Sequence, residues 1–244
     1  MATTDSGVTA PPEGQGDDLQ KLVYGLSHDM GAPLRAVVQF SQLIGRRLDG
    51  RLDEKEQYWL ALIQENGERA QQMIDALLVF SRLQSQRQPD SSFSLARLID
   101  SVLQKLGRHY DISVVKIGHV ELPEVTGCYG HWQLLLENVL KNALQYHPPE
   151  AGHQPQVVLQ CLQHQETIQV SVEDNGIGVS DTALELLVTP FKRLQSGHDY
   201  EGIGMGLTFC ERIVRLNDGA LLFAHSPQGG LAVTFIMPTV NRQD

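Results

Sequence analysis

The sequence lacks any long apolar run, and this absence excludes a membrane-spanning helix from what it encodes. A span needs about 18 consecutive apolar residues, whereas the longest runs here are as short as Ala76–Phe80. The N-terminus has neither the basic start nor the apolar stretch of a signal peptide. We therefore expect no membrane segment in this chain.

Cysteine and basic residues are also scarce. The three cysteines, Cys128, Cys161 and Cys210, are far apart and odd in number, so no disulfide framework is expected and a cytoplasmic location fits best. Lys and Arg number 19 against 29 Asp and Glu, which gives a net charge of −10. Nucleic-acid binding needs clustered cations to contact phosphates, so no nucleic-acid partner is expected.

Two helical stripes of apolar or small residues fill the N-terminal third of the sequence. They recur in steps of three and four, first from Leu19 to Leu48 and again from Trp59 to Phe80, which predicts two long helices. Between them, Asp53 and Glu56 have the spacing of a capping box at the second helix start. The pattern predicts an antiparallel helical hairpin.

A lone hairpin buries its apolar stripes poorly. Pairing two hairpins into a four-helix bundle would bury all four stripes, so a homodimer through the hairpin is expected. The alternative is that the hairpin packs against the C-terminal part of the same chain.

The rest of the sequence mixes shorter helices with alternating strands. Helices are predicted over Ser94–Leu106, His131–Tyr146 and Leu207–Leu216, and strands over Pro155–Leu162, Thr167–Glu173, Gly219–Ala224 and Leu231–Met237. This order predicts an α/β sandwich with one helical face. The expected fold class is α+β, a hairpin that forms a dimeric four-helix bundle followed by the sandwich.

These patterns divide the chain into three parts. Residues 1–17 are rich in Gly, Pro, Thr and acid, so they are predicted to be a disordered linker. The hairpin is assigned to residues 18–89 and the sandwich to residues 90–240.

A histidine early in the first helix is a candidate nucleophile. It belongs to the segment SHDMGAPLR, residues 27–35. A helical histidine is ordinarily a solvated or packed residue, but His28 lies off the apolar stripe. Asp29 can accept an N–H bond or a proton from the imidazole, which leaves the other nitrogen nucleophilic. Pro33 removes the backbone donor for the Asp29 carbonyl, so a bend is expected there.

Four further segments follow in the order ENVLKNALQY (137–146), DNGIG (174–178), PFKRL (190–194) and GIGMGLT (202–208). Each is weak evidence by itself. In the first, Asn138 and Asn142 share one helix face, and their amide oxygens can hold Mg²⁺. Two surface asparagines would look the same.

The DNGIG and GIGMGLT segments have similar ambiguity. A carboxylate at a strand end, such as Asp174, can accept a hydrogen bond from the exocyclic amine of adenine, yet D-N-G is also ordinary turn chemistry. Glycines before a helix let exposed N–H groups cradle phosphate. The Lys-Ser/Thr pair of a P-loop is absent from GIGMGLT.

Together, however, these segments resemble the sensor histidine kinases of two-component systems. SHDMGAPLR is similar to their H box, and the four later segments match the N box, first glycine box, F box and second glycine box in that order. The resemblance covers roughly Leu19–Pro238. It implies a dimerisation and phosphotransfer hairpin, a Bergerat-type ATP-binding catalytic domain, the cofactors ATP and Mg²⁺, and a response regulator receiver domain as partner.

The resemblance also implies a role for each matched residue. His28 is the phosphorylated residue, Asp29 its acid/base partner, and Arg193 reaches toward the terminal phosphate. The implied nucleotide-binding residues are Asn138 and Asn142 (also the Mg²⁺ ligands), Tyr146 and Asp174 at the adenine, Gly176 and Gly178 beside it, and Gly202, Gly204, Gly206 and Leu207 in the lid and the helix after it.

Two positions depart from the family pattern. Ala32 stands four residues after the histidine, where many relatives have Thr or Asn to position a hydrolytic water. Gln145 replaces the usual Lys or Arg, so a phosphate contact is lost or is supplied by Lys141 or Lys192.

The expected function is ATP-dependent autophosphorylation on His28, followed by transfer to an aspartate of a response regulator. Two alternatives stay open. One is an ATP-binding pseudokinase that heterodimerises with other histidine kinases, which the intact His28 and Asp174 disfavour. The other is a different ATPase of the same nucleotide-binding superfamily, which the H box disfavours.

Overall fold

The computed structural model describes residues 15–85, 88–118, 122–148, 153–164, 166–194, 200 and 202–238. The chain divides into two compact units, residues 1–82 and 83–244, which are described separately. Residues 1–14, within the predicted linker, lie outside the described part. In the part described, no helix is both long and apolar enough to cross a membrane.

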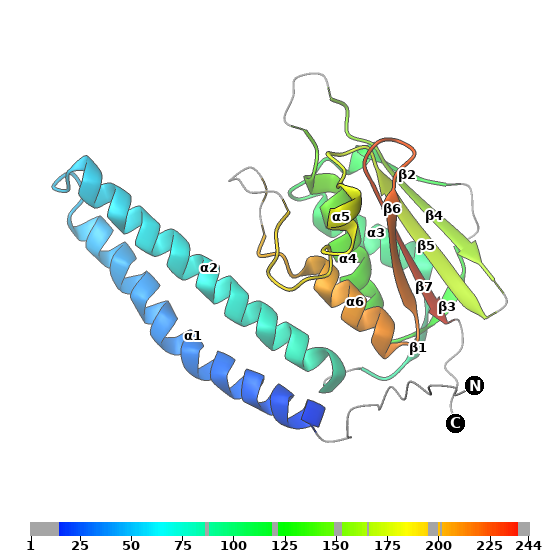
Figure 1. Ribbon diagram of the computed structural model, residues 1–244, viewed down its shortest axis with the longest axis horizontal. Coiled ribbons are helices and arrows are strands. Elements are labelled where there is room, and N and C mark those ends of the chain that lie inside the picture. Colours follow the sequence, from blue (N-terminus) through cyan, green and yellow to red (C-terminus); the bar gives the residue numbers. More distant parts are fainter. Residues whose placement is uncertain are drawn as a thin grey trace, which may run out of the picture. The chain divides into compact units, whose positions relative to one another are not determined.

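The first unit is a hairpin of the helices α1 (Gln15–Arg47) and α2 (Glu54–Ser85), which lie side by side (Figure 1). α1 begins within the segment predicted as linker and continues through Pro33 without a break. The predicted capping box is present. The Asp53 carboxylate accepts from the Glu56 N–H at 2.8 Å, and the Glu56 carboxylate accepts from the Asp53 N–H at 2.9 Å.

Small residues let the two hairpin helices approach each other. A Cβ atom at Gly67 would lie 2.6 Å from Val38 Cγ2, and one at Gly45 would lie 3.0 Å from Leu60 Cδ2. The close approach still leaves large apolar side chains of α1 and α2 exposed in the single chain. They are Met30, Val37, Phe40, Leu43, Ile44, Tyr58, Trp59, Ile63 and Val79.

The second unit contains a five-stranded sheet in the order β2-β4-β5-β7-β6. Its strands are β2 (Val115–Ile117), β4 (Val157–Gln163), β5 (Thr167–Asp174), β6 (Ala220–His225) and β7 (Leu231–Pro238). β2 is parallel to β4, and the other pairs are antiparallel. Every second residue of β5 is buried, ending with Asp174, so this carboxylate falls on the inner face at the strand end.

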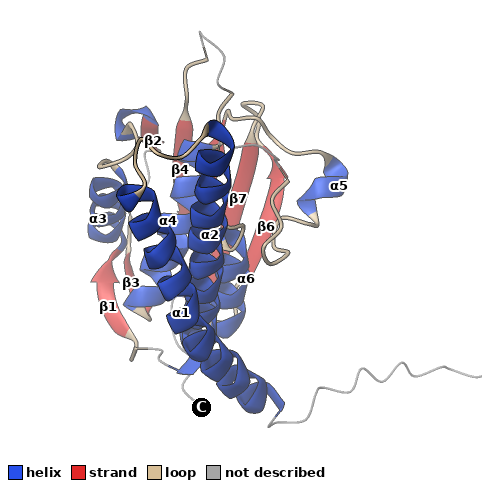
Figure 2. Cartoon of the chain, turned by 90° about the vertical axis from the view of Figure 1, so that its left-hand side faces the viewer, coloured by secondary structure: helices blue, strands red, loops and turns tan. Residues whose placement is uncertain are grey.

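Helices cover the inner face of this sheet (Figures 1 and 2). The helices are α3 (Leu95–Leu106), α4 (Tyr129–Gln145) and α6 (Gly206–Leu216); α4 and α6 pack on the strands, and α3 packs on α4. Their buried side chains form one core with the inner residues of β4, β5 and β7. The predicted fold class, a helical hairpin followed by an α/β sandwich, is confirmed.

Several short elements were not predicted. β1 (Ser91–Ser94) pairs antiparallel with β3 (Glu124–Gly127) in a separate two-stranded sheet. A 3-10 helix (Ile112–Val114) precedes β2, and α5 (Asp181–Leu184) follows β5. Elements of three or four residues are too short to show a periodicity, so pattern analysis does not detect them.

A buried histidine joins three segments of the second unit. His131 Nε2 lies 2.9 Å from the carbonyl oxygen of Leu83, and Nδ1 lies 3.1 Å from the amide nitrogen of Asn217. A carbonyl only accepts and an amide N–H₂ only donates, so these partners assign the neutral tautomer with its proton on Nε2. His131 thereby connects Leu83, which is the first residue of the second unit, with the start of α4 and the end of α6.

We predict that His131→Leu lowers the free energy of unfolding of the second unit by about 1–3 kcal/mol, because it removes both hydrogen bonds from buried polar groups. The measurement is urea unfolding followed by the fluorescence of Trp132, which is buried. Trp59, the other tryptophan, is replaced by Phe so that Trp132 alone reports.

The exposed His164 provides the matched control, and His164→Leu should change this free energy by less than about 0.5 kcal/mol. Equal unfolding midpoints for the two variants would contradict the structural role of His131.

Candidate functional site

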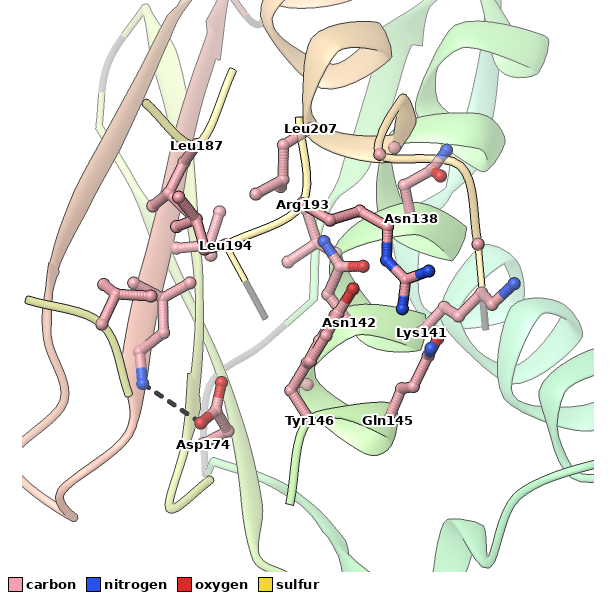
Figure 3. Close-up of a pocket in the computed structure, with 18 of the residues that line it drawn as sticks. Asn138, Lys141, Asn142, Gln145, Tyr146, Asp174, Leu187, Arg193, Leu194 and Leu207 are labelled. Atoms are coloured by element: carbon pink, nitrogen blue, oxygen red, sulfur yellow. Dashed lines mark hydrogen bonds between the residues drawn. The ribbon is translucent and has the colours of Figure 1, made fainter. Parts of the chain in front are cut away.

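A cavity of about 250 Å³ lies in the second unit between α4, the ends of β5 and β7, and the segments that precede α6. Asp174 lies on its sheet side, and Asn138, Asn142 and Tyr146 lie on its helix side (Figure 3). Much of the remaining lining is apolar. It comes from Val139, Val172, Ile177, Val179, Leu187, Leu194, Ile203, Met205, Leu207, Phe209, Leu231 and Val233.

The helical wall results from a four-residue repeat on α4. Asn138, Asn142 and Tyr146 succeed one another on one helix face and all line the cavity. The Asn138 amide N–H donates to the Leu134 carbonyl at 2.8 Å. A Cβ atom at Gly206 would lie 2.8 Å from Asn138 Oδ1, so the oxygen of Asn138 faces the start of α6.

Asp174 is fixed by the backbone of two separate segments. Its Oδ1 accepts from the N–H of Gly176 at 2.8 Å and from that of Leu231 at 3.1 Å. In the part of the chain that the structure describes, no hydrogen bond is made by Oδ2. The carboxylate is therefore held in place with one oxygen available to a donor in the cavity.

Burial raises the pKa of Asp174 above the ordinary value of an aspartate, and the two N–H bonds from Leu231 and Gly176 oppose this shift. The net direction is upward because the apolar surroundings disfavour the charged form more than the two donors stabilise it.

The DNGIG segment packs closely against the end of α4. The N–H of Ile177 donates to the Tyr146 carbonyl at 3.0 Å. A Cβ atom at Gly176 would lie 2.1 Å from that same carbonyl oxygen, so only glycine fits there. Gly178 has a φ of +62°, which also favours glycine.

The PFKRL and GIGMGLT segments together form the opposite wall of the cavity. The Phe191 N–H donates to the Gly204 carbonyl at 3.1 Å, and a Cβ atom at Gly204 would lie 2.6 Å from the Lys192 carbonyl oxygen. Arg193 extends from this wall toward Asn138, Lys141 and Asn142 of α4 (Figure 3).

The N-terminus of α6 borders the cavity without a side-chain cap. Its N-cap residue is Met205, which makes no side-chain capping bond, and Met205, Gly206 and Leu207 line the cavity. The first N–H groups of a helix lack intrahelical acceptors and carry partial positive charge. This end of α6 is therefore suited to an anion such as phosphate.

Most residues predicted for nucleotide binding meet at this cavity. Those that line it are Asn138, Asn142, Tyr146, Asp174, Gly178, Arg193, Gly202, Gly204, Gly206 and Leu207. Gly176 does not line it and instead supports Asp174 and Tyr146 from behind. Asp29 is exposed on α1 in the first unit, and the side chain of His28 lies outside the described part.

Apart from Leu207, the apolar lining was missed by sequence reasoning. Leu187, Leu194 and Val233 lie in three different segments, and each looks like an ordinary core residue in the sequence. Their common cavity follows only from the packing of these segments, so no local signal identifies them.

Two family descriptions match the chain. Residues 18–86 match "His Kinase A (phospho-acceptor) domain". Residues 129–241 match "Histidine kinase-, DNA gyrase B-, and HSP90-like ATPase".

Similar curated proteins include a phytochrome and a histidine kinase. Cyanobacterial phytochrome A of Nostoc sp. is 26% identical over 226 residues, which are 93% of this chain and 29% of that protein. The circadian input-output histidine kinase CikA of Synechocystis sp. is 27% identical over 91% of this chain and 30% of its own length. The chain thus spans about 30% of the length of these two relatives.

Solved structures share the fold. Full-length ShkA in complex with AMPPNP has a TM-score of 0.64 at 20% identity, covering 91% of this chain and 46% of that one. The catalytic domain of histidine kinase ThkA has a TM-score of 0.52 at 18% identity, covering 62% and 99%.

The second unit therefore belongs to the class of ATPase domains shared by histidine kinases, gyrase B and Hsp90. The match of the preceding hairpin to a phosphoacceptor domain completes the assignment. The chain is the core of a sensor histidine kinase.

We predict that the affinity of the cavity for ADP falls as the pH drops through the raised pKa of Asp174. Oδ1 already accepts two N–H bonds, so a proton would be carried by Oδ2 and would turn this acceptor into a donor. Because burial raises the pKa, the loss should begin at a higher pH than for an exposed aspartate.

Calorimetric titration with ADP at a series of pH values tests this. The phosphate groups of ADP titrate in the same way with either protein. The Asp174→Asn variant lacks only the carboxyl group, so it serves as the control. It should bind ADP more weakly at neutral pH, and the wild-type affinity should converge on it as the pH falls. Parallel pH profiles would contradict the assignment of Oδ2 as the acceptor.

Proposed function

We propose that this chain binds ATP with Mg²⁺, phosphorylates itself on His28 and passes the phosphoryl group to an aspartate of a response regulator receiver domain. The observation that carries the proposal is the cavity in which Asp174, the asparagine face of α4 and the uncapped start of α6 meet. We assign hairpin functions to residues 18–89 and catalytic functions to residues 90–240.

The nucleotide fits the cavity in one direction. The adenine lies against Tyr146 among the apolar lining, and its exocyclic amine donates to Asp174 Oδ2. The phosphates then extend toward Arg193 and the N-terminus of α6, which supply positive charge.

Asn138 and Asn142 are suited to hold Mg²⁺. Amide oxygens are hard ligands of the kind this cation prefers, with phosphate oxygens and water completing its shell. The Asn138 N–H₂ group bonds to Leu134, which turns its oxygen toward the phosphate end of the cavity. The cation would neutralise phosphate charge there.

The hairpin supplies the nucleophile. A nitrogen of His28 attacks the γ-phosphorus in line, and the N–P bond forms as the bond to the ADP oxygen breaks. Asp29 accepts a hydrogen bond or the proton from the N–H of the other ring nitrogen. Transfer of the phosphoryl group to the aspartate carboxylate of the receiver domain then forms an O–P bond as the N–P bond breaks, which releases His28. The protein thus contributes mainly positioning and charge stabilisation.

A second copy of this chain is the partner we infer for the hairpin. Phe40, Trp59 and Ile63 each expose about half or more of their surface in the single chain, together with the other apolar side chains of α1 and α2 named above. A four-helix bundle of two hairpins would bury this area, which a single hairpin leaves in water.

We predict that His28→Gln abolishes autophosphorylation while leaving ADP affinity within about twofold of wild type, because His28 and the cavity belong to different units. Incubation with γ-labelled ATP, followed by acid and base treatment, identifies the product as acid-labile and base-stable phosphohistidine.

Three outcomes of this experiment separate the possibilities. Undiminished acid-labile label in the His28→Gln variant would overturn the assignment of the nucleophile. Nucleotide binding by the wild-type chain with no label at all would favour a pseudokinase. Base-labile, acid-stable label would indicate a serine kinase instead.

We further predict a kinase-biased protein with little phosphatase activity toward a phosphorylated regulator. Ala32 lies one helical turn after His28 on α1 and is exposed, and it has no hydroxyl or amide to hold a water in line with phosphorus. Ala32→Thr should raise phosphate release above that of the wild-type chain.

The assay adds the chain and ADP to a pre-phosphorylated cognate regulator and measures inorganic phosphate. Wild-type chain should release phosphate at close to the regulator's own rate of decay. A wild-type rate far above that decay, without return of phosphate to His28, would show that another group orients the water.

A further inference from the structure

Tyr200 is outside the set of residues predicted for the site and does not line the cavity, yet it contacts two residues that do. Its ring lies 4.9 Å from the ring of Tyr146, centroid to centroid, with a 39° tilt between the planes. Its backbone carbonyl accepts a hydrogen bond from the Arg193 guanidinium. One residue therefore contacts two of the side chains that line the cavity.

The hydroxyl group of Tyr200 adds a third attachment. It donates to the His147 carbonyl at 2.8 Å. His147 follows the C-terminus of α4, where the backbone leaves the helix at Tyr146. Tyr200 is thus held at the end of the helix that carries Asn138, Asn142 and Tyr146.

Tyr200 contacts Tyr146 and Arg193 from outside the cavity. Tyr146 lines the cavity and Tyr200 does not, so Tyr200 packs against Tyr146 without occupying the space for a ligand. Such a contact restricts the rotation of the Tyr146 ring before a ligand arrives. The hydrogen bond to the Tyr200 carbonyl similarly restricts Arg193, a long side chain with several rotatable bonds.

We propose that Tyr200 is a positioning residue for the bound nucleotide, which holds the Tyr146 ring for the adenine and the Arg193 guanidinium for the phosphates. The proposal rests on the function proposed above, that this cavity binds ATP. Because these two side chains are already ordered, less conformational entropy is lost when the nucleotide binds.

The two effects are separable because they use different atoms of Tyr200. The ring and the hydroxyl belong to the side chain, whereas the acceptor for Arg193 is the main-chain carbonyl. Tyr200→Ala removes the support of Tyr146 and keeps an acceptor for Arg193. Tyr200→Phe removes only the bond to His147 and keeps the ring.

The test is calorimetric measurement of the dissociation constants of ADP and of a non-hydrolysable ATP analogue, both with Mg²⁺. Tyr200→Ala should weaken both ligands about three- to tenfold, and equally, because the support it removes acts at the adenine end. Tyr200→Phe should restore most of the loss. His109→Ala, at an exposed ring of the second unit that does not line the cavity, is the control and should bind as wild type does.

A double-mutant cycle separates positioning from a general effect on folding. In a Tyr146→Ala background, Tyr200→Ala should cause no further loss of affinity, because the ring it supports is absent. An equal loss in both backgrounds would overturn the proposal. The Trp132 unfolding midpoint of Tyr200→Ala should match that of the wild-type chain, and a lowered midpoint without restoration of affinity by Phe would also overturn it.

The wild-type measurement distinguishes this inference from the function on which it rests. If the wild-type chain bound neither ADP nor the ATP analogue, the proposed function would fail. If it bound both, and Tyr200→Ala bound them as tightly, the proposed function would stand and the role of Tyr200 alone would be wrong.

Discussion

The carboxylate of Asp174 links the end of β5 to the start of β7, and the turn that follows it is bonded to the end of α4. Its Oδ1 accepts from the N–H groups of Gly176 and Leu231, so the turn after β5 is connected to the start of β7. The same turn is fastened to the end of α4 through the bond between Ile177 and the Tyr146 carbonyl. Because Oδ1 is used for structure, Oδ2 is presented to the cavity in one orientation.

This arrangement explains why the turn contains glycine. The chain must bring a strand end, a helix end and a carboxylate together within hydrogen-bonding distance, and no side chain fits at Gly176, where a Cβ atom would be 2.1 Å from the Tyr146 oxygen. The opposite wall follows the same rule at Gly204, whose φ is +77°. At these two positions glycine is needed because another backbone segment passes too close for a side chain.

The two units have different physical requirements. The second unit has a full apolar core and a sheet whose inner face is covered by helices, so it buries its own apolar surface. The hairpin leaves side chains such as Phe40 and Trp59 exposed, so burying them needs surface from outside the hairpin. The hairpin is the part that matches a phosphoacceptor domain, and the self-contained unit is the part that matches an ATPase domain.

The sequence by itself determined the long helices, the capping box at Asp53 and Glu56, and the order of the site segments. These features are local, because each is a periodicity or a spacing within a few helical turns. Tertiary structure alone decided that β1 pairs with β3, that Gly176 supports the cavity without lining it, and that Tyr200 lies against Tyr146. Contacts of this kind join residues that are distant in sequence and that carry no shared pattern, so their partners exist only after the strands and helices have packed.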